Sequence, residues 1–509
     1  MTPYFDYAAT TPLDPRVEAA MGRASSLGGD FANPSSDHPA GRLAATAVER
    51  ASEQVRRCIN AVDYRVTWTS GATESNNLAI LGHVTAQLRR GRERRRLLVA
   101  ATEHAAVLAA AQAADALGFS LEQLPVEADG RLAPATLDAA LDDDVALVSV
   151  GHVNNETGVV QPLASLAPLI QAAGALFHID AAQGAGRLPL DASTLGADLV
   201  SLSAHKFYGP KGIGALVHHA NVRLAPLLHG GGQQQGLRPG TLPVASIVGL
   251  GEALALADDE VERERQVSLR DALRDRLAAL GGVVVNGAVD GSPHVLNVAF
   301  AGVHGDALRS RLADLNVSFG SACSGRAGAS HVLRSMARPD ALADAAREPL
   351  RGIERRRGDV DRRFPNRFEP DAGAVELVEL TVVRDGVAAP EVSHHVQEFV
   401  QSCAALLERD VQRRVLGLDR RAAADADAES ESAAAELVDR GRLVGYVNRV
   451  AQRRQVNGGA EVGPVGRGRQ RGQRRQRVVT GLGDHAVSDP QRVQPERRCA
   501  RGQPHGPRP

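Results

Sequence analysis

The hydrophobic positions of this chain alternate between short apolar runs and longer segments with helical spacing. Within the first 220 residues, runs that predict strands occupy residues 65–69, 97–100, 145–150, 176–180, 199–202 and 214–217. Between them, residues 105–117 and 163–173 have the three-to-four spacing of helices that bury one face. Because the strand runs are mostly apolar rather than alternating, we expect burial on both faces, as in a mostly parallel sheet. The pattern predicts an α/β fold.

A second group of elements follows this predicted sheet. Residues 244–280 have the spacing of one long helical segment, residues 283–285 and 295–300 predict strands, and residues 305–315 predict a further helix. We interpret this group as a second, smaller domain.

The pattern decays after about Arg347 into sequence rich in Arg, Gln, Gly and Ala. Residues 347–509 contain 30 of the 57 arginines, together with an acidic run at residues 425–431. Such a segment buries too little apolar surface to offset the entropy lost on ordering, so we expect this tail to be largely disordered. A basic surface for a partner is the alternative interpretation.

Charge and cysteine usage exclude several classes of function. The chain has 59 basic and 60 acidic residues and a net charge of −1. This balance argues against a general binder of nucleic acids or membrane surfaces, because both need a sustained basic field. The four widely spaced cysteines favour a reducing compartment. No apolar stretch approaches about 18 residues and the N-terminus lacks a signal-peptide pattern, so we expect a cytoplasmic protein that contacts neither nucleic acid nor membrane directly.

Lysine is scarce, and this narrows the candidate chemistry. Only Lys206 and Lys211 occur, against 57 arginines. Lysine forms Schiff bases and its pKa falls readily on burial, whereas arginine stays charged. Lys206 comes shortly after a buried apolar run and follows Ser203 and His205, which can donate hydrogen bonds to a phosphate. This combination suits a cofactor that carries an aldehyde and a phosphate.

Two other strand ends carry candidate chemistry. Residues 70–77 follow a strand and open a helix, where small residues let backbone N–H groups approach an anion. Asp180 ends the strand at 176–180 and is the type of carboxylate that keeps a pyridinium nitrogen protonated, with Gln183 three residues later. A helix cap or a buried ion pair is the alternative for Asp180.

These residues belong to a longer series of motifs that resembles the cysteine desulfurases, pyridoxal-phosphate enzymes of fold type I within the class-V aminotransferase group. The motifs occur in order at residues 4–12, 33–36, 69–77, 102–104, 153–158, 178–183, 203–214, 229–233, 238–243 and 320–323. The resemblance implies a large cofactor-binding domain with a mostly parallel seven-stranded sheet at residues 13–255 and a small α+β domain at residues 256–346. Residues 1–12 would join the small domain, and residues 347–509 remain as the tail.

The resemblance implies a role for each motif residue in holding pyridoxal 5′-phosphate. Lys206 would form the Schiff base with the cofactor and move the substrate proton, and His104 would stack on the pyridine ring and relay protons. Asp180 would pair with the ring nitrogen. Asn155 and Gln183 would lie near the ring and its phenolic oxygen. The residues implied to hold the phosphate are Ala72, Thr73, Ser203 and His205. Thr241 would reach the cofactor phosphate of the partner subunit. The last contact implies a homodimer with shared sites, whereas Lys211 is interpreted as structural.

Cys323 is the nucleophile that the resemblance implies. It lies among small residues at 318–328, which favour a mobile loop in which a thiolate can reach a substrate; a buried structural thiol is the alternative. The implied reaction converts L-cysteine to L-alanine and leaves a persulfide on Cys323. The sulfur would pass to an acceptor such as an iron–sulfur scaffold or a tRNA-thiolation relay. A selenocysteine lyase is the alternative activity.

The chain departs from the family pattern near Ala346. In the family an Arg-Xaa-Ser-Phe/Leu-Gly segment follows, and its arginine binds the substrate carboxylate, near Asn155. Arg347 stands near that position, but Glu348-Pro349 disfavours the expected strand. We hypothesise a shift of reading frame here, because one back-translation of residues 347–355, read one base later, gives Ala-Ser-Arg-Phe-Gly-Ala-Ser-Ser. An incomplete small domain would give a cofactor-binding homologue with impaired catalysis, or a partner-binding subunit.

Overall fold

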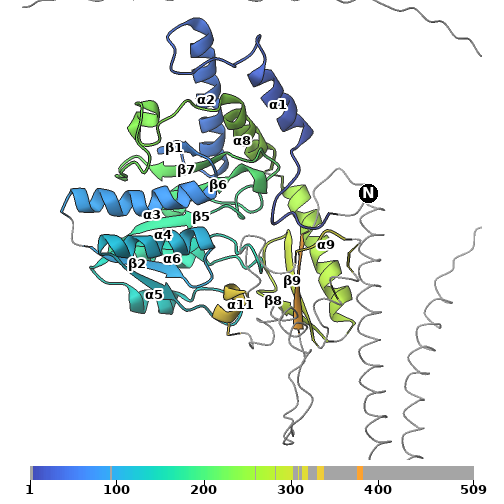
Figure 1. The fold of residues 1–509 in the computed structure, drawn as a ribbon. Coiled ribbons are helices and arrows are strands. Elements are labelled where there is room, and N and C mark those ends of the chain that lie inside the picture. The colour runs from blue at the N-terminus through green and yellow to red at the C-terminus, as the bar shows by residue number, and fades with distance from the viewer. Residues whose placement is uncertain are drawn as a thin grey trace, which may run out of the picture. The chain divides into compact units, whose positions relative to one another are not determined.

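Two β-sheets organise the part of the chain that the structure, a computed structural model, describes. The described residues are 4–91, 94–257, 259–280, 282–301, 308, 312–313, 315–318, 330–337 and 375–381. Among them, seven strands form the first sheet in the order β1-β7-β6-β5-β4-β2-β3, and three strands form the second in the order β10-β9-β8 (Figure 1).

The first sheet contains all six strands predicted from the apolar runs at residues 65–217. Its strands are β1 (Tyr64–Thr69), β2 (Arg96–Ala100), β3 (Ser120–Leu124), β4 (Val145–Gly151), β5 (Leu176–Asp180), β6 (Leu199–Ser203) and β7 (Gly214–His219). Strands β2 to β6 run parallel, and β7 is antiparallel to its neighbours β6 and β1. The prediction of an α/β fold with a mostly parallel seven-stranded sheet is therefore confirmed. Strand β3 was not predicted, because it is an edge strand with a largely exposed, polar sequence.

Helices cover both faces of the first sheet. Leu97 and Val99 of β2 pack with α3 and α4, whereas Leu98 and Ala100 pack in a larger core with α2, α6 and α8. Successive strand residues point to opposite faces, so cover on both sides explains the continuous apolar runs. The described helices are α1 (Pro15–Ser25), α2 (Pro39–Cys58), α3 (Ala72–Arg89), α4 (Ala105–Ala113), η1 (Ala114–Leu117), α5 (Pro134–Ala140), α6 (Leu163–Ala173), α7 (Ala192–Leu195), η2 (Ala204–Lys206), η3 (Gln233–Gly236), α8 (Val244–Ala257), α9 (Glu260–Ala278) and α11 (His331–Ser335).

Residues 244–280 form two helices, α8 and α9, instead of the single helical segment predicted. The break lies at Asp259, whose side chain caps α9 by accepting a hydrogen bond from the Glu262 amide at 3.1 Å. Aspartate is a preferred residue at this position because it satisfies a backbone donor at the start of a helix. Leu254 of α8 packs in the core of the first sheet, whereas Leu277 of α9 packs in the core of the second.

The second sheet is antiparallel and consists of β8 (Val283–Asn286), β9 (Val295–Ala301) and β10 (Val375–Thr381). Strand β10 was not predicted, and it lies within the region interpreted from the sequence as a tail. The remainder of that region lies outside the described residues, as do Cys323, Arg347 and most of the helix predicted at residues 305–315. The division of the chain into domains stays a prediction.

The N-terminal segment, residues 4–11, links the core of the second sheet to the end of β6. Phe5 packs in the second core, and its amide donates to the Asn316 carbonyl at 2.8 Å. At the other end of the segment, the backbone amide and the hydroxyl of Thr11 both donate to the His205 carbonyl at 2.9 Å. None of the helices in the described ranges is long and apolar enough to cross a membrane.

Candidate active site

A cavity of about 420 Å³ lies at the carboxyl ends of the parallel strands. In open α/β sheets ligands bind at this edge, because strand-end loops converge there. The residues predicted to hold a cofactor within one subunit all line this cavity: Ala72, Thr73, His104, Asn155, Asp180, Gln183, Ser203, His205 and Lys206. Lys211, interpreted from the sequence as structural, lines it as well.

Lys206 lies in η2, the turn that follows β6. Its Nζ donates to the carbonyl oxygens of Ala8 at 2.6 Å and Ala9 at 3.0 Å. Arg187 Nη2 donates to the carbonyl of Lys206 at 3.0 Å, which fixes the backbone of the turn. The N-terminal segment therefore holds the amine in the cavity wall by neutral carbonyl groups.

Asp180 ends β5 and presents a buried carboxylate that is fixed at both oxygens. Asn76 Nδ2 donates to Oδ2 at 2.7 Å, and the Ala182 amide donates to Oδ1 at 2.9 Å. The side chain therefore has one orientation, and it lies in the wall of the same cavity as the Lys206 amine. A carboxylate fixed in this way can accept a further hydrogen bond from a ring nitrogen, because each oxygen has two lone pairs.

Glu103 is a second buried carboxyl group in the cavity wall, and no role was predicted for it from the sequence. Its Oε1 accepts a hydrogen bond from the Gly151 amide. Burial, together with the charge of Asp180, raises the pKa of Glu103 to about 8. Glu103 is therefore mostly protonated near pH 7 and adds little negative charge beside Asp180. Its position next to His104 in the motif at 102–104 was the available signal.

The N-terminus of α3 forms a cradle suited to an anion. The helix begins after Gly71, which makes no side-chain cap, so side chains do not take the first backbone N–H groups. Gly214 lets this turn approach closely, since a Cβ there would lie 2.5 Å from the Gly71 Cα. Ser203 and His205 line the same cavity, and burial lowers the pKa of His205 to about 4, so its ring is neutral. A helix N-terminus with a hydroxyl nearby is typical of phosphate sites.

Local hydrogen bonds hold His104 and the turn that carries Asn155, the two residues that the resemblance places near the cofactor ring. His104 caps α4, with Nδ1 accepting from the Ala106 amide at 3.1 Å. The neutral ring therefore carries its proton on Nε2. Asn154 accepts hydrogen bonds from both the amide and the hydroxyl of Thr157, and this turn places Asn155 in the cavity wall.

Thr241 is exposed and is absent from the lining of this cavity within one subunit. The loop that carries it is tied to the cavity rim, because Arg238 Nε donates to the Glu74 carboxylate at 2.9 Å and Glu74 lines the cavity. The implied contact of Thr241 with a partner's phosphate stays a prediction. The implied roles of Cys323 and Arg347 concern residues outside the described ranges.

Comparison with known proteins identifies the class. Residues 3–343 match the Aminotransferase class-V family, so the chain belongs to this family, and the match ends close to Ala346. The recognition made from the motifs is confirmed.

Two similar curated proteins carry the name cysteine desulfurase IscS. Cysteine desulfurase IscS of Pseudomonas aeruginosa (strain UCBPP-PA14) is 44% identical over 350 residues, which are 67% of this chain and 86% of the relative. IscS of Vibrio cholerae serotype O1 (strain M66-2) is 43% identical with the same coverage. A solved NifS-like protein has a TM-score of 0.66 and 28% identity over 80% of this chain and 100% of its own. SspA in complex with cysteine has a TM-score of 0.60 and 34% identity over 68% and 96%.

Proposed function

We propose that this chain is a cysteine desulfurase that takes sulfur from L-cysteine, releases L-alanine and leaves a persulfide on Cys323. The observation that carries the proposal is one cavity that contains the Lys206 amine, the Asp180 carboxylate and the N-terminus of α3. The 44% identity to an IscS cysteine desulfurase supports the same activity.

The donors and acceptors of the cavity fit pyridoxal 5′-phosphate. Lys206 offers the amine for its aldehyde, Asp180 an acceptor for its ring nitrogen and Gln183 an amide for its phenolic oxygen. The phosphate would bind at the start of α3, beside Ser203 and His205. The cavity, about 420 Å³, lies within the usual range for small-molecule sites, roughly 300–1,000 Å³. When bound, this cofactor would supply an electron sink for the substrate's Cα–H electrons.

Lys206 and His104 are proposed to handle protons during turnover. The Lys206 amine would take the proton from the substrate Cα, and the carbonyl groups of Ala8 and Ala9 offer it a defined resting position when it is not bonded to the cofactor. His104 would pass a proton at Nε2, the nitrogen that its role as helix cap leaves to carry hydrogen. Proton transfer by positioned side chains contributes about 10²–10⁴-fold to such rates.

The Cys323 thiolate is proposed to attack the sulfur of the substrate. The sulfur–sulfur bond forms as the carbon–sulfur bond breaks, and the electron pair of the broken bond stays with the carbon fragment, which leaves as alanine after protonation. Cys323 is five residues after Ser318 and seven before Ser330. Ser318 donates to Asp6 at 2.7 Å and Ser330 donates to Glu156.

The remaining contacts belong to the same proposal. Asn155 and Arg347 are proposed to bind the substrate carboxylate, and Thr241 is proposed to reach the cofactor phosphate of a second subunit in a homodimer. The ion pair between Arg238 and Glu74 holds the loop of Thr241 at the cavity rim of its own subunit. The persulfide sulfur is proposed to pass to an iron–sulfur scaffold or a tRNA-thiolation relay in the cytoplasm.

The test uses the purified full-length chain with pyridoxal 5′-phosphate. We expect a visible absorption band that changes when L-cysteine is added, with alanine and sulfide formed in the same sample. Lys206→Ala should abolish the band, whereas the matched variant Lys211→Ala should retain it. Cys323→Ala should retain the band but form no persulfide. Alanine released from selenocysteine but not from cysteine would replace the proposal by a lyase, and a band without product would show impaired catalysis.

A further inference from the structure

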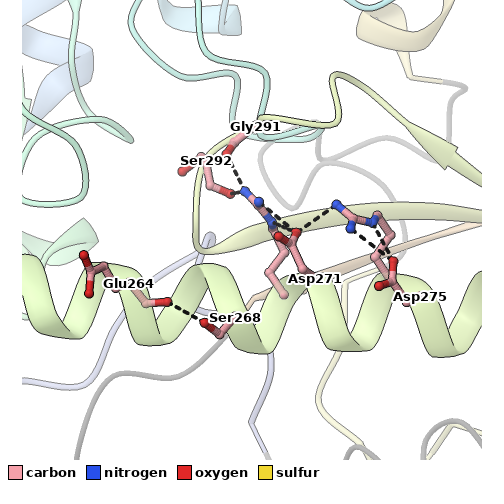
Figure 2. Close-up of polar contacts among 8 residues, drawn as sticks. Glu264, Ser268, Asp271, Asp275, Gly291 and Ser292 are labelled. Atoms are coloured by element: carbon pink, nitrogen blue, oxygen red, sulfur yellow. Dashed lines mark hydrogen bonds and ion pairs between the residues drawn. The ribbon is translucent and has the colours of Figure 1, made fainter.

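A buried arginine of α9 fixes the loop that precedes β9. Arg270 is 6% exposed, and its Nη1 donates to the carbonyl oxygens of Gly291 and Ser292, the latter at 2.9 Å. Figure 2 shows Gly291 and Ser292 beside Asp271, whose carboxylate holds the same guanidinium at 3.0 Å. The Ser292 amide also donates to the Gly158 carbonyl at 2.7 Å. The backbone of this loop is therefore held from two sides.

Ser292 begins a chain of side-chain hydrogen bonds that ends in the cavity. Its hydroxyl lies 2.6 Å from His294 Nδ1, and His294 Nε2 lies 3.3 Å from Gln183 Oε1. Gln183 Nε2 then donates to the Ala8 carbonyl at 2.8 Å. Ser292 and His294 are 0% and 1% exposed, and Gln183 is 5% exposed while lining the cavity.

The hydrogen bonds that link Ser292, His294 and Gln183 are consistent with only one assignment of donors and acceptors. Burial, reinforced by the charges of Arg187, Lys206 and Arg270, holds the pKa of His294 well below its usual range, so the imidazole is neutral. A neutral imidazole has one donor and one acceptor nitrogen. Since the oxygen of Gln183 can only accept, Nε2 of His294 carries the hydrogen, and Nδ1 accepts from the Ser292 hydroxyl.

The opposite orientation of the Gln183 amide is unfavourable. A flipped amide would point its oxygen at the Ala8 carbonyl, so that two acceptors would face each other without a hydrogen between them. In the favoured orientation, Ala8 takes one of the two amide hydrogens of Gln183, and the other can be donated to a group in the cavity. His294 holds the oxygen end of the same amide.

We propose that His294 is a positioning residue for the cofactor site, which fixes the Gln183 amide so that it presents a donor to the phenolic oxygen of the cofactor. The proposal rests on the function proposed above. His294 acts through Gln183, and the loop anchored by Arg270 and Ser292 holds His294 in turn. The amide is thereby aligned before the cofactor binds, so that binding costs less ordering entropy.

The test compares buried histidine variants in the full-length chain loaded with pyridoxal 5′-phosphate. His294→Leu removes the donor to Gln183, and His294→Gln keeps a donor at the end of the side chain. Ser292→Ala removes the hydroxyl that donates to His294 Nδ1, so that the proton of the ring is no longer confined to Nε2. His83→Leu is the matched control, because His83 is a buried histidine whose Nε2 lies 2.9 Å from another glutamine, Gln87, and neither lines this cavity. The readouts are the cofactor dissociation constant, the pH midpoint of the visible band and the free energy of unfolding.

We expect His294→Leu to weaken cofactor binding about threefold to tenfold, the effect of one neutral hydrogen bond. The pH midpoint of the band should rise by about 0.5–1 unit, because the phenolate loses a donor. Ser292→Ala should shift both readouts in the same direction and His294→Gln should restore them, while His83→Leu should leave both unchanged at a similar loss of stability.

Two results would overturn the proposal. One is a set of His294 and Ser292 variants that lose stability as His83→Leu does, yet bind the cofactor with wild-type affinity and midpoint. The other is an equally large change in cofactor affinity and in the pH midpoint of the band when His294→Leu is made in a Gln183→Ala background, since the effect must pass through Gln183. Failure of the proposed function is distinct, because the wild-type chain itself would then show no band.

Discussion

Replacing Glu103 by glutamine is expected to stabilise the folded chain increasingly as the pH rises. Glu103 is 4% exposed, and burial with the charge of Asp180 raises its pKa from 4.5 to about 8. In the unfolded chain the carboxyl group ionises near its ordinary value. Between these two pH values, the folded chain therefore keeps a proton that the unfolded chain has lost.

The size of the effect follows from this difference in bound protons. Because the folded state binds more protons, the free energy of unfolding falls as the pH rises through the window from 4.5 to about 8. A pKa that differs by one between the folded and unfolded chain corresponds to about 1.4 kcal/mol, so the loss reaches roughly 3 kcal/mol at pH 7 and roughly 5 kcal/mol above pH 8. Glutamine does not titrate, and its oxygen can still accept the hydrogen bond from Gly151, so the variant lacks this loss.

The assay is denaturant unfolding of the cofactor-free, full-length chain at intervals between about pH 5 and pH 9. The quantity of interest is the stability of Glu103→Gln minus that of the wild type, because the other titrating groups largely cancel in this difference. Glu53→Gln, at an exposed glutamate of α2, controls for the loss of one carboxylate. A difference that stays constant over the whole pH range would show that Glu103 is already ionised in the folded chain, and would refute the reasoning.

Two further predictions concern the phosphate cradle and the reading frame. Gly214→Ala should weaken cofactor binding about tenfold or more, since its Cβ would lie 2.5 Å from both Gly71 Cα and Leu202 O and overpacking costs about 1–3 kcal/mol. Gly232→Ala is the control in the same cofactor titration, because a Cβ added at Gly232 would meet no heavy atom of the described residues within 4 Å other than those of its chain neighbours. Equal cofactor affinities of the Gly214→Ala and Gly232→Ala variants would contradict the role of the cradle. A frame shift near Ala346 predicts that close relatives do not share residues 347–509 in this frame; sequencing of the locus and its relatives checks this, and a shared tail would exclude it.

The first sheet could be predicted because cover on both faces leaves a strong signal in the sequence. A run such as 145–150 is apolar except for Ser149, and all six of its residues are buried in β4. The edge strand β3 carries no such signal, since its side chains are mostly exposed. The break between α8 and α9 was also missed. Helix-forming residues continue on both sides of it, and the signals of the boundary are the change from the apolar α8 to the charged α9 and the cap at Asp259.

The candidate site could be predicted as a set of strand-end residues but not as a network. Lys206 and Asp180 were found from their residue types and positions after strands. Glu103 and His294 were missed because what distinguishes them is burial and neighbours distant in sequence: the pair of His294 and Gln183 is separated by 111 positions. A pattern of nearby residues carries no information on such a pair.

The N-terminal segment also sets an order for biogenesis. Ala8 meets Gln183 and Lys206 at separations of 175 and 198 positions, and Asp6 meets Ser318 at a separation of 312. Contacts that close such long loops form late in folding, because the entropy of loop closure is lost before the contact contributes any stabilisation. During synthesis the hydrogen-bond acceptors of residues 6–8 leave the ribosome first, long before their donors at Gln183, Lys206 and Ser318 have been synthesised. The cofactor proposed above would therefore be loaded late, and ribosome-bound nascent chains that end before Lys206 could not bind it through that lysine.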